Sequence, residues 1–293
     1  MAHKAGFVNI IGNPNVGKST LMNAFVGERL SIITSKAQTT RHRILGIVNG
    51  EDFQVVLSDT PGIIKPAYGL QESMMNFVKS AFEDADVLLY LVELGEKELK
   101  DEAFFAKITG ATIPVLLLIN KIDTGDEALL AESLELWQTK VPNAEVFAIS
   151  ALENFGVPEV FNRILELLPE SPPFYPKDQL TDKPERFFVN ETIREKILIQ
   201  YKKEIPYAVE IDTEEFFEDD DIIRIRSVIM VERDTQKGII IGHKGQAIKW
   251  VGIEARKDLE KFFGKQIHIE LYVKVNKNWR NDSRQLKRFG YNN

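Results

Sequence analysis

A glycine-rich stretch near the amino terminus has the residue types and the spacing of a phosphate-binding loop. Gly12 is followed after four residues by Gly17, Lys18 and Ser19, between an apolar run and an amphipathic run. Its glycines let backbone N–H groups converge on phosphate oxygens, and the next helix adds its positive end. Lys18 can reach the β- and γ-phosphates, and the Ser19 hydroxyl can ligate Mg²⁺. This predicts a nucleoside triphosphate site formed by Gly12, Asn13, Pro14, Asn15, Val16, Gly17, Lys18, Ser19 and Thr20.

The motif NKID, which directly follows the apolar run PVLLLI, indicates which base of the nucleotide the site binds. Asp123 can accept hydrogen bonds from N1–H and the 2-amino group of guanine, and adenine lacks both donors. Asn120 can contact the O6/N7 edge and connect this segment to the phosphate loop, while the stem of Lys121 covers the purine face. The motif therefore favours guanine. The predicted base contacts are completed by the segment after the last strand, Ser150, Ala151 and Leu152, with the Ala151 amide facing O6.

Two further segments can complete the metal and γ-phosphate site. In LSDTPGIIKP, Asp59 can hold Mg²⁺ through water and the Gly62 amide can meet the γ-phosphate, with Thr60 and Pro61 between them. In SKAQTTRHR, Thr39 and Thr40 are adjacent, and sequence alone does not decide which points inward; we favour Thr40. We predict as metal ligands Ser19, Thr40 and Asp59, and as catalytic groups Lys18, Thr40 and Gly62.

Ile63 occupies the position after this loop where Ras-like GTPases carry a water-orienting glutamine. An isoleucine side chain neither donates nor accepts a hydrogen bond, so it cannot hold the attacking water. We therefore expect its side chain to turn away and the intrinsic hydrolysis rate to be low. Such a protein suits a switch that waits for a partner to align the water.

The elements that must position these motifs alternate in type over the first 170 residues. Short apolar runs suited to buried strands are FVNII, FQVVLS, DVLLYLV, PVLLLIN and EVFAIS. Amphipathic stretches lie between them, and Asn49-Gly50 predicts a hairpin that adds one antiparallel edge strand. The pattern predicts an α/β fold: an N-terminal Ras-like P-loop GTPase domain with a mostly parallel six-stranded sheet.

A proline-rich segment divides the chain, and we predict a GTPase domain over 1–170, a linker over 171–185 and a second domain over 186–293. The second domain should contain a helix, strands at YAVEIDTEEF and IIRIRSVIMVER, the glycine-rich turn GIIIGHKG, a second helix, a third strand and a short basic tail. The acidic run Glu218–Asp221 is expected in the turn between its first two strands. This order predicts a smaller α+β domain.

The turn of the second domain contains Gly242-His243-Lys244-Gly245. Glycines at this spacing let a sugar–phosphate backbone approach, as in the loop with which KH domains bind single strands. Residues 222–293 carry 16 Lys and Arg against 7 Asp and Glu, whereas residues 1–185 carry 16 against 26. A basic carboxyl-terminal end on an acidic body suggests a polyanionic partner for that end. We expect Ile239–Ile241 to be core rather than a platform for bases.

Together these motifs resemble the Era family of bacterial GTPases, in which a Ras-like domain precedes a type II KH domain. The resemblance rests on GNPNVGKST, AQTTRHR, DTPG, NKID, SAL, VERDTQKGIIIGHKGQAIKWVGIEARKDLE and VKVNKNWRND. It implies GTP and GDP as ligands, Mg²⁺ as cofactor, and K⁺ beside Asn15, unless Asn15 only caps the loop. It implies RNA contacts from Lys237, Gly238, Ile240, Ile241, Gly242, His243, Lys244, Gly245 and Lys249.

The resemblance also implies partners: the 3′ end of 16S ribosomal RNA and the small (30S) ribosomal subunit, whose assembly such proteins assist. It implies a monomer in the cytoplasm, with peripheral contact at the inner face of the cell membrane. Two other functions stay open on sequence alone. One is a GTPase whose basic domain binds protein or anionic lipid, and the other is an RNA-modifying enzyme. The absence of cysteine excludes a Cys nucleophile, a Cys-ligated zinc site and disulfides.

Overall fold

Two compact units make up the chain in a computed structural model that describes residues 2–291. One unit contains the residues up to Ala67 together with Gln71–Asp182, and the other contains Tyr68–Leu70 together with the residues from Lys183 onward. Among the described residues, no helix is both long and apolar enough to cross a membrane.

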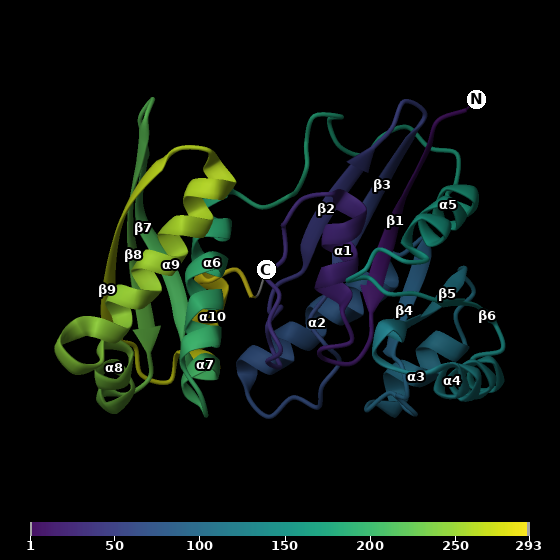
Figure 1. Ribbon diagram of the computed structural model, residues 1–293, viewed down its shortest axis with the longest axis horizontal. Helices are drawn as coiled ribbons and strands as arrows, with labels where there is room; N and C mark the ends of the chain where they lie inside the picture. Colours follow the sequence, from purple (N-terminus) through teal and green to yellow (C-terminus); the bar gives the residue numbers. More distant parts are fainter. Residues whose placement is uncertain (1, 292–293) are drawn as a thin grey trace. The chain divides into compact units, whose positions relative to one another are not determined.

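A six-stranded sheet forms the centre of the first unit (Figure 1). Its strand order is β2-β3-β1-β4-β5-β6, and only β2 runs antiparallel to its neighbour. This confirms the predicted parallel sheet and the Asn49-Gly50 hairpin. The strands are β1 (Lys4–Ile11), β2 (Ile44–Asn49), β3 (Phe53–Asp59), β4 (Val87–Glu93), β5 (Val115–Asn120) and β6 (Ala144–Ala148).

Five helices accompany this sheet, each in a predicted amphipathic stretch: α1 (Lys18–Val26), α2 (Gly69–Glu83), α3 (Glu102–Thr109), α4 (Glu127–Lys140) and α5 (Val157–Leu167). The strand order reverses at β1, so right-handed crossovers place helices on both faces of the sheet. Every residue of β5 is consequently buried, which explains its uninterrupted apolar sequence. The carboxyl ends of β1, β3 and β5 carry the phosphate loop, Asp59 and NKID.

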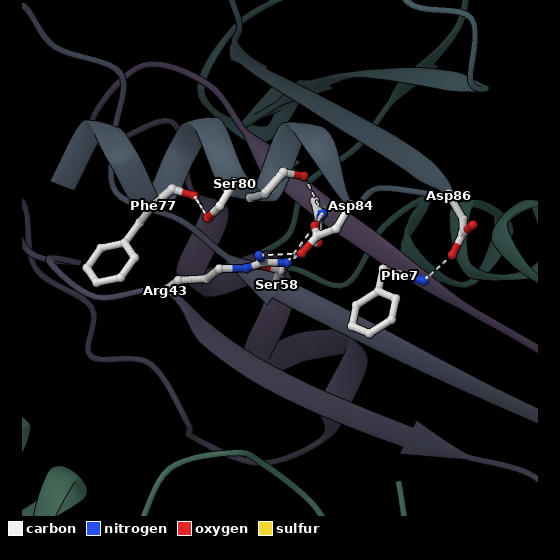
Figure 2. Close-up of polar contacts among 9 residues, drawn as sticks. Phe7, Arg43, Ser58, Phe77, Ser80, Asp84 and Asp86 are labelled. Carbon is white, nitrogen blue, oxygen red and sulfur yellow. Dashed lines mark hydrogen bonds and ion pairs between the residues drawn. The ribbon is translucent and has the colours of Figure 1, made fainter. Parts of the chain in front are cut away.

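A polar network holds the chain just before β2 against β1 and the end of α2 (Figure 2). Arg43 donates two hydrogen bonds of 2.6 and 2.9 Å to the carboxylate of Asp84 and a third of 2.7 Å to the Ser58 hydroxyl. Asn9 donates to the same carboxylate over 2.7 Å. This fixes the end of the segment that contains Thr40, because the next residues enter β2 directly.

The segment predicted as a linker lies along the outer edge of β2. The amide of Ile47 donates to the carbonyl of Leu180 over 2.8 Å, and the amide of Leu45 donates to the Asp182 carboxylate over 3.0 Å. Gln54 accepts hydrogen bonds from the amides of Phe174 and Tyr175. Residues 171–182 therefore form an ordered border of the first sheet, and the next helix already begins at Glu185.

The second unit contains a three-stranded sheet with order β7-β8-β9, in which β7 and β8 are antiparallel and β8 and β9 parallel. Helices α6 and α9 pack on each other, α6 against β7 and α9 against β9 (Figure 1). Glu218 ends β7 and residues 219–221 form the turn, as predicted for the acidic run. The elements are α6 (Glu185–Gln200), α7 (Ile205–Ala208), β7 (Glu210–Glu218), β8 (Ile222–Val231), α8 (Asp234–Ile241), α9 (Gln246–Phe263), β9 (Gln266–Val275) and α10 (Ser283–Arg288).

Two local predictions for this unit were wrong. Residues 207–208 are not strand but end the short helix α7, which Pro206 can begin because proline fits the first helical turn. Gly238–Ile241 is not part of a glycine-rich turn but the second half of α8. The basic tail is folded: Trp279 is fully buried, its indole N–H donates to the carbonyl of Ala208 over 3.1 Å, and α10 follows.

Candidate functional site

The phosphate loop is held open between β1 and α1. Gly17 has a φ of +101°, and a Cβ atom there would lie 2.3 Å from the Asn120 side-chain nitrogen, so only glycine fits. Lys18 begins α1, and its ammonium donates to the carbonyls of Asn13 over 2.8 Å and Gly12 over 3.2 Å. The loop thus has a buried cation at the amino-terminal end of a helix, an arrangement that attracts phosphate.

Burial is the main influence on the Lys18 ammonium. It lowers the pKa of Lys18 to about 8, although the carboxylates of Asp59 and Glu96 favour the charged form. A phosphate group at this loop would favour the charged form further. Nucleotide binding above about pH 8 must therefore be accompanied by uptake of a proton at Lys18.

We expect the affinity for GDP to fall as the pH rises above about 8, by up to about tenfold per pH unit. Lys18→Arg should bind with little pH dependence over the same range, because a guanidinium stays protonated. Calorimetry between pH 7 and 9, in buffers of different ionisation enthalpy, measures both affinity and proton uptake. Equal pH dependence in the two proteins would show that Lys18 does not titrate on binding.

Three oxygen-bearing side chains meet beside Lys18. The Ser19 hydroxyl donates to Asp59 Oδ2 over 2.7 Å, and Thr40 Oγ1 lies 2.9 Å from Ser19 Oγ and 3.3 Å from the same carboxylate oxygen. Burial raises the pKa of Asp59, and among residues 2–291 its other oxygen, Oδ1, is buried and has no hydrogen bond of normal geometry. Two hydroxyls and a buried carboxylate are the hard oxygen donors that suit Mg²⁺.

Thr39 lies apart from this group. Its hydroxyl donates to the carbonyl of Lys36 over 2.6 Å and lies 2.6 Å from the Thr34 hydroxyl. Of the two adjacent threonines, the structure brings Thr40 to Ser19 and Asp59.

Asn120 connects the base end of the site with the phosphate end. Its side-chain nitrogen donates to the carbonyl of Val16 over 2.8 Å, and its oxygen accepts the amide of Ala151 over 2.9 Å. The Ala151 amide, which the sequence analysis expected to face O6 of the base, donates to Asn120 in this structure. The Ser150 hydroxyl donates to the Asp123 carboxylate over 2.5 Å and orients it. Lys121 forms an ion pair of 2.8 Å with Glu93.

A cavity of about 590 Å³ runs between these two ends, a volume that suits a nucleotide. Most predicted residues line it: Pro14, Asn15, Gly17, Lys18, Ser19, Thr20, Thr40, Thr60, Gly62, Asn120, Lys121, Asp123 and Leu152. Sequence reasoning missed the wall formed by Ile32, Ile33, Thr34, Ser35, Gln38 and Glu93. The remaining predicted residues lie outside the lining: Gly12, Asn13, Val16, Asp59, Pro61, Ser150 and Ala151.

Ile63 does not line this cavity. Its side chain is fully buried, and its amide donates to the carbonyl of Gly12 over 3.1 Å. The side chain thus packs into the protein, as expected. The position that holds the water in Ras-like GTPases here carries a core residue.

The loop from Gly242 to Gly245 connects α8 to α9 in an uncommon conformation. Gly242, Lys244 and Gly245 have φ values of +70°, +50° and +75°. Backbone in this left-handed region favours glycine at Gly242 and Gly245. His243 and Lys244 are exposed, and a Cβ atom on Gly245 would meet nothing within 4 Å. The loop presents open backbone to solvent.

A groove of about 290 Å³ follows this loop between α9 and β9. Its apolar floor and cationic rim are formed by Ile248, Lys249, Gly252, Ile253, Arg256, Ile267, His268, Ile269 and Leu271. Of this set, the RNA contacts named in the sequence analysis include only Lys249. Alternation along β9, with apolar residues at every second position, was the available signal, but it did not indicate which helix lies beside the strand.

The three isoleucines before the loop differ from one another. Ile240 is fully buried, and its carbonyl accepts the Tyr201 hydroxyl over 2.6 Å, so the predicted RNA contact of this side chain was wrong. Ile239 is 49% exposed, which contradicts the expectation that it belongs to the core. Ile241 and Lys237 are half-buried, and Gly238 is exposed. Consecutive residues of helix α8 point in different directions around its axis, so the exposure of the three isoleucines differs.

Comparison with known proteins covers nearly the whole chain. The family model for 50S ribosome-binding GTPases matches residues 7–121, and that for KH domains matches residues 204–280. The chain is 42% identical to GTPase Era of Alkaliphilus metalliredigens, over 99% of this chain and 100% of the relative. It is 41% identical to GTPase Era of Staphylococcus haemolyticus, over 99% and 97%.

Two solved structures are similar over their full length. One is Era in complex with MgGDPNP and nucleotides 1506–1542 of 16S ribosomal RNA, at 37% identity and a TM-score of 0.94, covering 99% of each chain. The other is a variant of Aquifex aeolicus Era bound to GDP and aluminium fluoride, at 38% identity and a TM-score of 0.94, covering 98% of this chain and 99% of that one.

Proposed function

Because the chain belongs to the Era family of GTPases, we propose that it is a slow GTP-driven switch that binds the single-stranded 3′ end of 16S ribosomal RNA. Hydrolysis yields GDP and phosphate in the first unit, with Mg²⁺ as cofactor. The second unit binds the RNA. In this role the protein assists assembly of the small ribosomal subunit, as a monomer in the cytoplasm with peripheral contact at the inner membrane surface.

The observation that carries the GTPase assignment is the convergence of five side chains on one cavity. Lys18 supplies the charge for the phosphates, Ser19 and Thr40 supply hydroxyls for Mg²⁺, and Asp123 and Asn120 lie at the base end. Catalysis of phosphoryl transfer consists mainly of such positioning and charge neutralisation. The Gly62 amide, at the cavity wall, would meet the γ-phosphate.

Slow hydrolysis follows from the same cavity. Ile63 is packed in the core and cannot orient water, and no other glutamine than Gln38 lines the described cavity. Water alignment then depends on groups that arrive with a partner. Such a protein stays in the GTP form for the duration of its encounter with that partner.

RNA binding is supported by three features of the second unit. The loop exposes His243 and Lys244 and leaves open space at Gly245, an apolar groove with a cationic rim lies beside the helix that follows it, and residues 222–293 carry a net charge of +9. A related chain of the same fold was solved with 16S ribosomal RNA. Apolar surface can hold bases while Lys249 and Arg256 meet phosphates.

The test of this function is RNA binding by the full chain with Mg²⁺ and a non-hydrolysable GTP analogue. We expect the 3′ end of 16S ribosomal RNA to bind about 100-fold more tightly than a length-matched shuffled sequence. Binding should weaken with added salt, because Lys and Arg displace counterions from phosphates. Equal binding of both RNAs, or binding of anionic vesicles in their place, would contradict the proposal.

The metal site leads to a prediction that separates the two threonines. Thr40→Ala removes a hydroxyl beside Ser19 and Asp59, so the Mg²⁺-dependent preference for GTP over GDP should fall by about tenfold or more. Thr39→Ala is the matched control and should retain the preference. Titration of both nucleotides with and without Mg²⁺ measures it. A loss with Thr39→Ala alone would transfer the ligand role to Thr39.

K⁺ is a further proposed cofactor, held beside the phosphates near Asn15. Asn15 lines the cavity, has a φ of +67° and donates from its side chain to the carbonyl of Ser35 over 3.0 Å. A monovalent cation there would neutralise charge that develops between the β- and γ-phosphates. Hydrolysis should run several-fold faster in K⁺ than in Na⁺, and Asn15→Ala should remove the difference. Equal rates of the wild type in both salts would assign Asn15 to the loop alone.

A further inference from the structure

Residues 93–100, which begin with the last residue of β4, contact both ends of the nucleotide cavity; we call this segment the β4 loop. At the base end, the amide of Leu94 donates to the carbonyl of Asn120 over 2.9 Å, and Glu93 pairs with Lys121 over 2.8 Å. At the phosphate end, the loop contacts Asn13. The sequence motifs gave this charged stretch no role, since its charges suggest an exposed turn.

The side chain of Asn13 is buried and forms its hydrogen bonds with the β4 loop. Its side chain is 4% exposed, and its nitrogen donates to the Glu96 carboxylate and to the carbonyl of Glu98 over 3.0 Å. Its side-chain oxygen accepts the amide of Lys100 over 3.3 Å. The backbone carbonyl of Asn13 is itself an acceptor for the Lys18 ammonium. The β4 loop therefore reaches the phosphate-binding lysine through one intervening residue.

Glu96 anchors this loop through hydrogen bonds to its carboxylate and to its backbone carbonyl. One carboxylate oxygen accepts from Asn13, and the other accepts the amide of Glu93 over 2.8 Å. Its backbone carbonyl accepts the indole N–H of the fully buried Trp137 over 3.1 Å. Both carboxylate oxygens thus face donors. A glutamine side chain would replace one of these two oxygens by an NH₂ group. Either the Asn13 side chain or the Glu93 amide would then face another hydrogen-bond donor.

We propose that Glu96 is a positioning residue for the phosphate end of the nucleotide site, and that the β4 loop sets the spacing between the phosphate loop and NKID. The proposal rests on the nucleotide site proposed above. Glu96 acts through Asn13 on Gly12–Lys18, where the β-phosphate binds in a loop of this kind. Glu93 acts on Lys121 at the base end, and more weakly, because the pair is 43% and 32% exposed.

Competition binding of GDP and GMP separates the two ends, since only GDP carries a β-phosphate. Glu96→Gln should lower the affinity for GDP by about tenfold and that for GMP by much less, because a charge-assisted hydrogen bond to the phosphate loop is lost. Glu93→Gln should weaken both nucleotides by the same factor of about three or less. Glu98→Gln is the matched control, because only its backbone carbonyl contacts Asn13, and both affinities should be unchanged.

Asn13→Ala tests the same contact from the other side and should lower the ratio of GDP to GMP affinity similarly. Adding Glu96→Gln to Asn13→Ala should then have little further effect, because Asn13→Ala has already removed the hydrogen bond through which Glu96 contacts the phosphate loop. Equal losses for GDP and GMP in both single variants, or additive losses in the double variant, would overturn the positioning role. If the wild type bound GMP as tightly as GDP, the phosphate site itself would be wrong, and the proposal with it.

Discussion

Asp123→Asn is expected to exchange the base preference of the protein from guanine to xanthine. The wild-type carboxylate accepts from N1–H and from the 2-amino group, whereas an amide accepts from one and donates to a carbonyl at position 2. Ser150 donates to Asp123 over 2.5 Å and should hold the amide in the same plane. Two hydrogen bonds to a charged group are affected, so GTP affinity should fall by roughly 10³-fold.

Competition between GTP and xanthosine triphosphate measures this exchange. The variant should bind the xanthine nucleotide more tightly than GTP, whereas the wild type prefers GTP. Ser150→Ala is a useful control, because it removes a hydrogen bond that orients Asp123 but leaves the Asp123 carboxylate in place. The affinity for GTP should therefore fall, while the preference for GTP over xanthosine triphosphate should be unchanged. A variant that kept wild-type GTP affinity and gained none for xanthine would place the base elsewhere.

The second large effect is expected at the loop of the second unit. Gly245→Asp, the substitution that the sequence suggests, would combine charge with backbone strain, since Gly245 has a φ of +75°. The double substitution His243→Asp, Lys244→Asp avoids this, because both residues are exposed and Asp tolerates the left-handed conformation of position 244. Two carboxylates facing a sugar–phosphate backbone should lower RNA affinity by roughly 100-fold or more.

The chain contains a matched control for this effect. Lys203 is also an exposed lysine of the second unit with a left-handed backbone, at a φ of +57°. Lys203→Asp therefore makes the same exchange of side chain, at the same kind of backbone position, as the single substitution Lys244→Asp. RNA affinity should fall for Lys244→Asp and stay at the wild-type value for Lys203→Asp, while GTP hydrolysis without RNA stays at the wild-type rate in both. Equal losses would mean that net charge alone determines binding.

Short motifs determined which parts of the site could be predicted. Lys18 and Ser19 lie within one loop whose conformation depends on its own glycines, and Asp123 follows its strand by three residues, so spacing alone locates them. Glu96 and Asn13 are 83 residues apart, and their contact exists only because β1 and β4 are neighbours in the sheet. No local pattern reports such a contact.

The groove of the second unit was missed for a related reason. Ile248, Ile253 and Leu271 have the spacing of core residues, and half-exposure appears only when α9 and β9 are set side by side. Similarly, three consecutive isoleucines, Ile239 to Ile241, do not show which side chain is buried until the segment is known to be helical. For the basic tail the sequence analysis assigned no helix, because its anchor, Trp279, packs near the distant α7.

The border that residues 171–182 form along β2 matters for any shortened version of the chain. A free strand edge exposes unpaired N–H and C=O groups, and it pairs readily with the edge of another molecule. Here the amides of Leu45 and Ile47 are covered by Asp182 and Leu180. A fragment that stopped at residue 170 would uncover them and should self-associate through β2, whereas a fragment that continued to Asp182 keeps its edge closed and should remain dispersed.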